Sequence, residues 1–115
     1  MRREQRLTST TDFEAVCTKG KSWADGLLVL RALPNEMGTT RYGVAVGKRL
    51  GGAVVRNRIK RRLREGARLT PAKDGWDIVF IARGDAVNAD YHALKHSIED
   101  LLARSHLLSN GGKQA

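Results

Sequence analysis

The alternation of apolar and polar residues along the chain predicts short strands separated by turns. Residues 27–33 and 41–46 are rich in β-forming side chains, and Pro34 and Gly38 lie in the turn between them. Residues 76–82 form an almost continuous apolar run. Such a run is typical of a strand that is buried on both faces of a sheet.

Apolar residues that recur every three or four positions predict three helices. The T-x-x-E pattern from Thr11 to Glu14 has the form of a capping box, and it opens a short helix that ends at Gly20. A second helix is expected over residues 53–69, and Asp90 begins the last one. The last helix carries apolar side chains at core spacing: Tyr91, Leu94, Ile98, Leu101 and Leu102.

The second helix separates into two faces when its residues are placed at ~100° intervals. One face is apolar and consists of Val55, Ile59, Leu63 and Ala67. The opposite face is polar and consists of Asn57, Arg61, Arg64 and Arg68. The edges between them carry Arg56, Arg58, Lys60 and Arg62. We therefore expect this helix to lie on a core with the polar face in solvent.

Most of the net charge of the chain lies in this helix and just before it. Residues 48–68 contain nine basic residues and one acid, a net +8 of the formal +9 for the whole chain. A surface helix whose charges merely face water is the simpler alternative. However, like charges three or four positions apart repel one another, and only Glu65 offsets them. A helix that keeps this repulsion is expected to meet a polyanion, and nucleic acid is favoured.

Size and composition exclude several classes of protein. A chain of 115 residues builds one core, which must be mainly aliphatic because only 5% of the residues are aromatic. Cys17 is the only cysteine, so no intramolecular disulfide can form. No apolar run approaches the ~18 residues of a membrane span, and no secretory signal follows the basic N-terminus. We expect a cytoplasmic protein whose partner is acidic, because the sequence pI is about 10.5.

The basic segment also carries a family resemblance. Residues 48–65 read KRLGGAVVRNRIKRRLRE and meet every fixed position of the pattern K-x-x-G-x-A-V-x-R-N-R-x-K-R-x-x-R-E. Further matches are Asp12-Phe13, R-Y-G-V-A-V at 41–46, D-I-V-F-I-A-R at 77–83 and D-Y-H-A-L at 90–94. In these features the chain resembles the protein subunit of bacterial ribonuclease P, and only the segment after about residue 108 lacks the resemblance.

The resemblance implies an α+β fold in one small domain. It predicts a mixed four-stranded sheet and three helices in the order α-β-β-β-α-β-α. One RNA-binding domain is expected over residues 1–110, and the tail that begins with Gly111-Gly112 (residues 111–115) is expected to be disordered. The resemblance also implies a left-handed β-α-β crossover between residues 41 and 82, against the right-handed preference of such units.

The resemblance further implies a role in an endonuclease that removes the 5′ leader of precursor tRNA. In that enzyme a catalytic RNA holds most of the Mg²⁺ and performs the hydrolysis, while the protein is an auxiliary subunit. We expect no catalytic and no metal-binding residue in this chain. The expected partners are the catalytic RNA and precursor tRNA, and neither a membrane nor a further protein is required.

Two sets of RNA-contacting residues follow from the resemblance. The expected contacts with the catalytic RNA are Lys48, Arg49, Arg56, Asn57, Arg58, Lys60, Arg61, Arg64 and Arg68. The expected cleft for the single-stranded leader contains Phe13, Cys17, Arg31 and Arg41. Phe13 is either a stacking platform or a core residue. Family members often have aromatic residues where this chain has Cys17 and Arg31, so weaker base stacking is expected.

Other functions leave weaker signals in the sequence. The carboxylates are scattered, and Asp74 and Asp77 are interpreted as solvated turn residues, so autonomous metal-assisted cleavage is not expected. His92 and His96 have a spacing that can hold a metal, but no third ligand is evident. A structural RNA-binding protein of ribosomal type is the main alternative function. A DNA-binding helix module lacks the short turn and partner helix that it would need.

Overall fold

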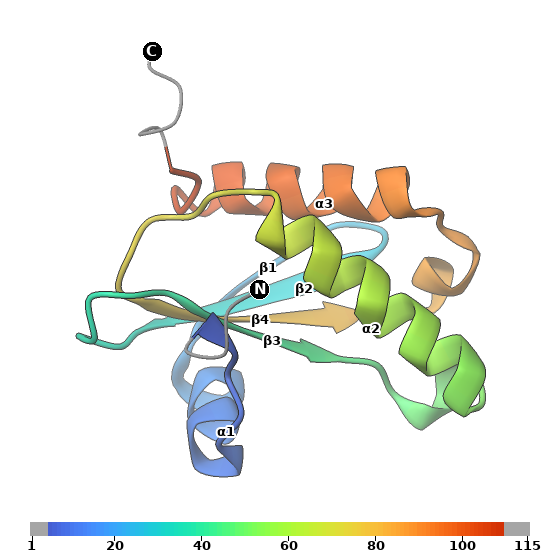
Figure 1. Cartoon of the computed structure of the whole chain (residues 1–115), viewed down its shortest axis with the longest axis horizontal. Coiled ribbons are helices and arrows are strands. Elements are labelled where there is room, and N and C mark those ends of the chain that lie inside the picture. Colours follow the sequence, from blue (N-terminus) through green and yellow to red (C-terminus); the bar gives the residue numbers. More distant parts are fainter. Residues whose placement is uncertain (1–4, 110–115) are drawn as a thin grey trace.

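The structure, a computed structural model, describes residues 5–109 and has the element order expected from the resemblance (Figure 1). The helices are α1 (Thr10–Lys19), α2 (Ala53–Arg68) and α3 (Tyr91–Arg104). The strands are β1 (Lys21–Ala24), β2 (Leu28–Pro34), β3 (Arg41–Ala45) and β4 (Trp76–Ala82). Two short 3-10 helices are η2 (Lys48–Leu50) and η3 (Gly84–Asn88).

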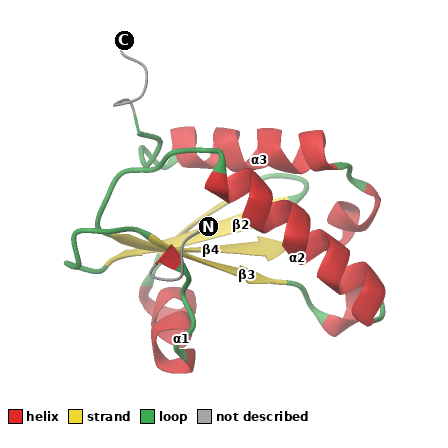
Figure 2. Ribbon diagram, viewed as in Figure 1, coloured by secondary structure: helices red, strands yellow, loops and turns green. Residues whose placement is uncertain are grey.

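The four strands form one mixed sheet in the order β1-β2-β4-β3. The β1–β2 and β2–β4 pairs are antiparallel, whereas β3 and β4 are parallel. The connection from β3 through α2 to β4 is left-handed, as expected (Figure 1). Helices α2 and α3 cover one face of the sheet, and α1 lies on the other (Figure 2). The α+β architecture with a mixed four-stranded sheet is therefore confirmed.

The main core lies between the sheet and helices α2 and α3. Its largest fully buried side chains include Phe80, Leu28, Leu30, Ile59, Leu63, Ile78, Leu94, Ile98, Leu101 and Leu102. A smaller cluster under α1 joins Leu7, Val16 and Val79. Alternate residues of β2 and β4 point into the two clusters, which is the two-residue period of a strand covered on both faces.

Two local predictions need correction. The first helix is not capped by Thr11, because the Ser9 side chain accepts the Asp12 N–H and Thr11 lies within the first turn. Ser9 serves because a β-region residue just before the helix can turn its oxygen toward that N–H. The strand Lys21–Ala24 is the fourth strand that the resemblance required, but no segment had been assigned to it. It is short and mostly exposed, so it carries little apolar alternation.

The remaining boundaries agree closely with expectation. Gly20 follows the last residue of α1, Asp90 is the N-cap of α3, and β4 spans residues 76–82. Helix α2 ends one residue earlier than expected, with Leu69 at its C-cap. The expected tail at residues 111–115 and residues 1–4 of the expected domain lie outside the described residues.

Candidate nucleic-acid interface

Helix α2 has the two faces that its sequence predicts. Ile59 and Leu63 are 0% exposed, and Ala67 is 2% exposed, so the apolar stripe lies in the main core. The polar face is exposed at each position: Asn57, Arg61, Arg64 and Arg68. The apolar stripe therefore holds α2 on the sheet (Figure 1), and the opposite, basic face lies in solvent.

The basic residues of α2 differ in whether they form hydrogen bonds or ion pairs within the protein. Arg61 and Arg64 make no hydrogen bond or ion pair with any described residue. Arg68 pairs with Glu65, and its hydrogen bonds lower the pKa of that carboxyl below its ordinary value. Arg62, which was not among the expected contacts, donates from its guanidinium to the Ala89 carbonyl at 2.8 Å. The exposed face thus presents unpaired cations, while an edge residue ties α2 to the segment before α3.

The other expected contacts with the catalytic RNA surround this face. Lys48 and Arg49 are exposed in η2, just before α2. Arg56 is half-buried, and its Nε donates to the Gly51 carbonyl at 3.1 Å. Lys60 and Arg58 are also half-buried, on the two edges of the helix, and Arg58 Nε is buried without a hydrogen-bond partner among the described residues. The nine residues therefore lie on one continuous segment. Lys48, Arg49, Arg61 and Arg64 are its exposed cations without a partner among the described residues.

Sequence reasoning missed Arg6 as a member of this surface. The segment around it runs beside β3, where Arg6 forms a bridge with Tyr42 and the Leu7 N–H donates to the Tyr42 carbonyl at 2.8 Å. A hollow of about 380 Å³ is lined by Arg6, Asn57, Arg61, Arg64, Glu65 and Arg68. The basic N-terminus was visible in the sequence, but its place beside α2 depends on a contact with β3 that has no local signal.

The expected leader cleft lies where α1 rests on the opposite face of the sheet. Val16 is fully buried against Val79, and Phe13 and Cys17 are half-buried beside that pair. The Phe13 ring packs directly on Gly43 of β3, where an added Cβ would lie 2.9 Å from the ring atom Cε2. Gly43 therefore makes room for this ring. Phe13 combines core contact with partial exposure, so neither of its two interpretations is excluded.

Arg31 and Arg41 hold α1 at its two ends. Arg31 on β2 donates to the carbonyls of Val16, at 3.3 Å, and Gly20, at 2.9 Å, near the C-terminal end of the helix. Arg41 on β3 pairs with Asp12 in the first turn at 3.3 Å. Both side chains thus lie on the α1 face of the sheet, as a role in the cleft requires. They also make internal contacts that the sequence did not indicate.

Asp77 is a buried ion-pair partner, and its interpretation as a solvated turn residue was wrong. Its Oδ1 accepts from Arg41 Nε and from Asn35 Nδ2, each at 2.8 Å, and its Oδ2 accepts from Arg41 Nη2 at 2.7 Å. These bonds to Asp77 raise the pKa of Arg41 above its ordinary value, against the opposing effect of burial. A charged residue inside an apolar strand is explained by this partner from the neighbouring strand. Asp74 is exposed, as expected.

The described carboxylates do not form a metal site. Within residues 5–109, no three His, Cys, Asp or Glu side chains come together as metal ligands. His92 and His96 are both exposed on α3 without a third ligand among these residues. No described helix is long and apolar enough to cross a membrane.

Comparison with known proteins agrees with this geometry. The Ribonuclease P family model matches residues 1–106. A ribonuclease P protein component from Dehalococcoides mccartyi is 39% identical over 99% of this chain and 95% of its own length. A Staphylococcus aureus RNase P protein mutant with defective mRNA degradation activity superposes with a TM-score of 0.84, at 30% identity over 92% of both chains. The RNase P protein from Thermotoga maritima gives a TM-score of 0.76, at 31% identity over 86% of this chain and 96% of the other.

The fold and the surface define a small α+β protein that presents one basic helix on an open face. The chain belongs to the bacterial ribonuclease P protein family. Members of this family are components of an endoribonuclease complex that processes tRNA, and this general function extends to the chain. The ribosomal-type alternative is not favoured.

Proposed function

We propose that this chain binds the catalytic RNA of ribonuclease P through the polar face of α2. The supporting observation is that Arg61 and Arg64 are exposed and unpaired among the described residues, on a helix whose opposite stripe is buried. Arginine forks suit phosphate oxygens and exposed base edges in RNA. Asn57 adds an uncharged amide that can both donate and accept a directed hydrogen bond. Lys48 and Arg49 extend this surface beyond the N-terminus of the helix.

The second part of the proposal is that the cleft beside α1 holds the single-stranded 5′ leader of precursor tRNA. Phe13 offers a partly exposed ring for base stacking, and Cys17 lines the same side of α1. Arg31 and Arg41 bring positive charge to the cleft for the leader phosphates. Because their guanidinium groups also hold α1, part of their effect on the leader would act through the position of Phe13.

Hydrolysis is assigned to the RNA of the complex, which would hold Mg²⁺. The carboxylates of this chain do not fit the task, since paired carboxylates would have to converge on the metal. Asp77 is occupied by Arg41 and Asn35, Asp12 is paired with Arg41, and the described residues offer no three-ligand cluster. The chain would therefore bind and position the two RNAs, without taking part in the chemical step.

Reconstitution with a ribonuclease P RNA and a leader-bearing precursor tRNA at low Mg²⁺ tests this function. Wild-type protein should restore cleavage at the correct 5′ end, and the Arg61→Glu/Arg64→Glu double variant should lose affinity for the catalytic RNA. A Lys21→Glu/Lys73→Glu double variant is the matched control, since it makes the same charge change at exposed positions outside α2. An equal loss of affinity in both variants would mean that net charge, and not the polar face of α2, controls binding to the catalytic RNA. Correct cleavage by RNA-free protein would contradict it.

A further inference from the structure

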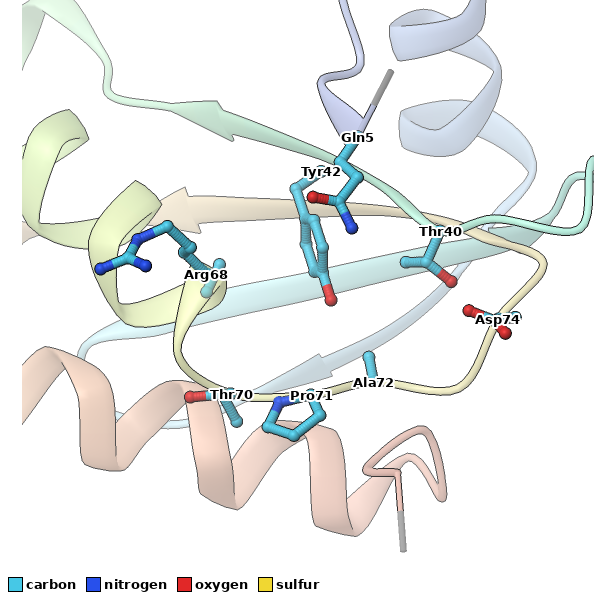
Figure 3. A pocket seen from close by; sticks show the side chains of 9 residues that line it. Gln5, Thr40, Tyr42, Arg68, Thr70, Pro71, Ala72 and Asp74 are labelled. Atoms are coloured by element: carbon cyan, nitrogen blue, oxygen red, sulfur yellow. The ribbon is translucent and has the colours of Figure 1, made fainter. Parts of the chain in front are cut away.

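A cavity of about 250 Å³ lies beside the basic face of α2, between β3 and the segment that connects α2 to β4 (Figure 3). We propose that this cavity binds one unstacked nucleobase of an RNA, and that it prefers bases with an exocyclic amino group. The proposal rests on the proposed function only in taking RNA as the ligand of the adjacent surface. It adds a separate site for a single nucleotide.

The size and walls of the cavity suit a flat ring. Pockets for drug-sized ligands have volumes of roughly 300–1,000 Å³, so 250 Å³ fits one base better than a longer ligand. The walls include the Tyr42 side chain, Pro71 and Ala72, which offer apolar contact (Figure 3). Ala67 of α2 also lines the cavity. Unstacked RNA bases are commonly held in this way, by an aromatic side chain with polar groups at the base edge.

Two of the polar groups that line the cavity, the Tyr42 hydroxyl and the Asp74 carboxylate, have no hydrogen bond with a described residue. The Tyr42 hydroxyl makes no hydrogen bond with a described residue, and burial, followed by the charge of Asp74, raises the pKa of Tyr42 to about 12. The hydroxyl is therefore protonated at neutral pH and can donate. The exposed Asp74 carboxylate can only accept. The Thr40 hydroxyl, in contrast, is already bonded to the Lys73 carbonyl and the Trp76 N–H.

This pair of groups discriminates between bases. A carboxylate that accepts from a base edge needs an N–H₂ or N–H donor, which adenine, cytosine and guanine provide through their amino groups. Uracil has no amino group, and its ring donor N3–H is flanked by two carbonyl oxygens that the Asp74 carboxylate would repel. The Tyr42 hydroxyl can donate to a ring nitrogen or carbonyl of the bound base. The chemistry therefore favours amino-bearing bases over uracil.

The cavity adjoins the proposed phosphate-binding surface. Arg68 lines both this cavity and the basic hollow formed by α2 and Arg6. A nucleotide whose phosphate meets Arg64 or Arg68 could thus place its base toward Tyr42. The basic hollow alone would bind any strand equally, because phosphate contacts carry no sequence information. The cavity would add selectivity for one nucleotide.

NMR titration of the full chain with AMP, CMP, GMP and UMP, and with ribose 5-phosphate as the base-free control, tests this site. Saturable shifts at the amides of Thr40, Tyr42 and Ala72 are expected for the amino-bearing nucleotides. Their affinity should exceed that of ribose 5-phosphate and UMP by about tenfold. Equal binding of ribose 5-phosphate would overturn the base site, and equal binding of UMP would overturn the preference for amino-bearing bases.

Two variants test the cavity itself. Ala72→Leu should fill it and abolish the nucleotide-dependent shifts, and Tyr42→Phe should weaken them severalfold while leaving the ring in place. Thermal unfolding checks that each variant is folded. If Ala72→Leu does not fold, unchanged nucleotide affinity in Tyr42→Phe is by itself sufficient to overturn the inference.

Binding to the two RNAs of the complex then identifies the source of the base. If the base comes from the catalytic RNA, both variants should weaken binding to that RNA by about tenfold, and if it comes from precursor tRNA, only substrate affinity of the assembled complex should fall. Failure of wild-type protein to bind the catalytic RNA would contradict the proposed function. If wild-type protein binds and both variants have the same affinity as wild type for both RNAs, only this inference would be overturned.

Discussion

The arginines on the polar face of α2 and those in the cleft beside α1 differ in whether they have hydrogen-bond or ion-pair partners within the protein. On the polar face of α2, Arg61 and Arg64 have no described internal partner. In the cleft, Arg31 donates to two carbonyls of the α1 segment, and Arg41 contacts Asp77 and Asp12. Positive charge in the sequence therefore does not by itself mean charge available to RNA. Availability depends on whether the fold brings an acceptor within reach.

The first prediction compares the same substitution in the two regions. Arg41→Gln leaves Asp77 buried without its ion partner, and this should cost roughly 3–5 kcal/mol of unfolding free energy, nearer the lower value because the Arg41 side chain is 16% exposed. Arg64→Gln should change stability by no more than about 0.5 kcal/mol, because its side chain has no described partner. Urea unfolding of both variants measures the difference. Similar costs would remove the distinction between the regions.

The second prediction concerns the two faces of α2. Ile59→Ala should lower the unfolding free energy by roughly 2–4 kcal/mol, because Ile59 is fully buried in the main core. The Arg61→Glu/Arg64→Glu variant should keep near wild-type stability and lose affinity for the catalytic RNA. Thermal unfolding and RNA binding are measured on the same samples. Unfolding of the charge variant, or an unchanged stability in Ile59→Ala, would show that the assigned phase of the helix is wrong.

The sequence predicts structural features that depend on residues close together in the chain, and it misses those that depend on distant residues. The phase of α2 was predictable because Val55, Ile59 and Leu63 repeat at helical spacing, and the basic face is defined by the same local period. The ion pair of Arg41 with Asp77 was not predictable, because the two residues are 36 positions apart in the chain and meet only when β3 and β4 pair. Local patterns thus indicate exposed faces well and internal ion pairs poorly.

The position of Arg6 and the identity of β1 show the same limit. Arg6 joins the α2 surface only through its bridge to Tyr42, and the Lys21–Ala24 strand is ordered by pairing with β2. Neither segment has an apolar period of its own that would reveal it. The handedness of the crossover was expected from the family resemblance alone, since residue periodicity carries no information about it.

The third prediction concerns the leader cleft. Phe13→Ala should lower affinity for leader-bearing precursor tRNA by roughly 1–3 kcal/mol in the assembled complex, if Phe13 stacks on a base. Affinity for mature tRNA should change little, because mature tRNA has no leader. Substitutions on α2 should affect both tRNAs together, through assembly with the catalytic RNA. The ratio of the two tRNA affinities is the measurement, with thermal stability checked alongside.

Gly43→Ala provides a second test that keeps the Phe13 ring. The added methyl group would lie 2.9 Å from Phe13 Cε2, so the ring must move away from the sheet. A smaller loss of leader affinity than in Phe13→Ala is therefore expected. An unchanged ratio of tRNA affinities in both variants would assign Phe13 to the core and leave the cleft without its aromatic contact.

The smallest expected effect concerns Glu65, the acid that pairs with Arg68. Because Arg68 lowers the pKa of Glu65, the pair persists at neutral pH and keeps this arginine partly occupied. Glu65→Gln should release Arg68 and allow one more phosphate contact. The slope of log K against log salt should therefore become steeper by roughly 0.7–0.9, which is the contribution of one phosphate in a single strand or in a duplex. Binding to the catalytic RNA at several salt concentrations measures the slope. Glu99→Gln on α3 is the control, because it breaks another carboxylate pair within one helix, the Lys95–Glu99 pair, outside the polar face of α2. An equal change of slope in both variants would mean that net charge, rather than the arginines of α2, controls binding.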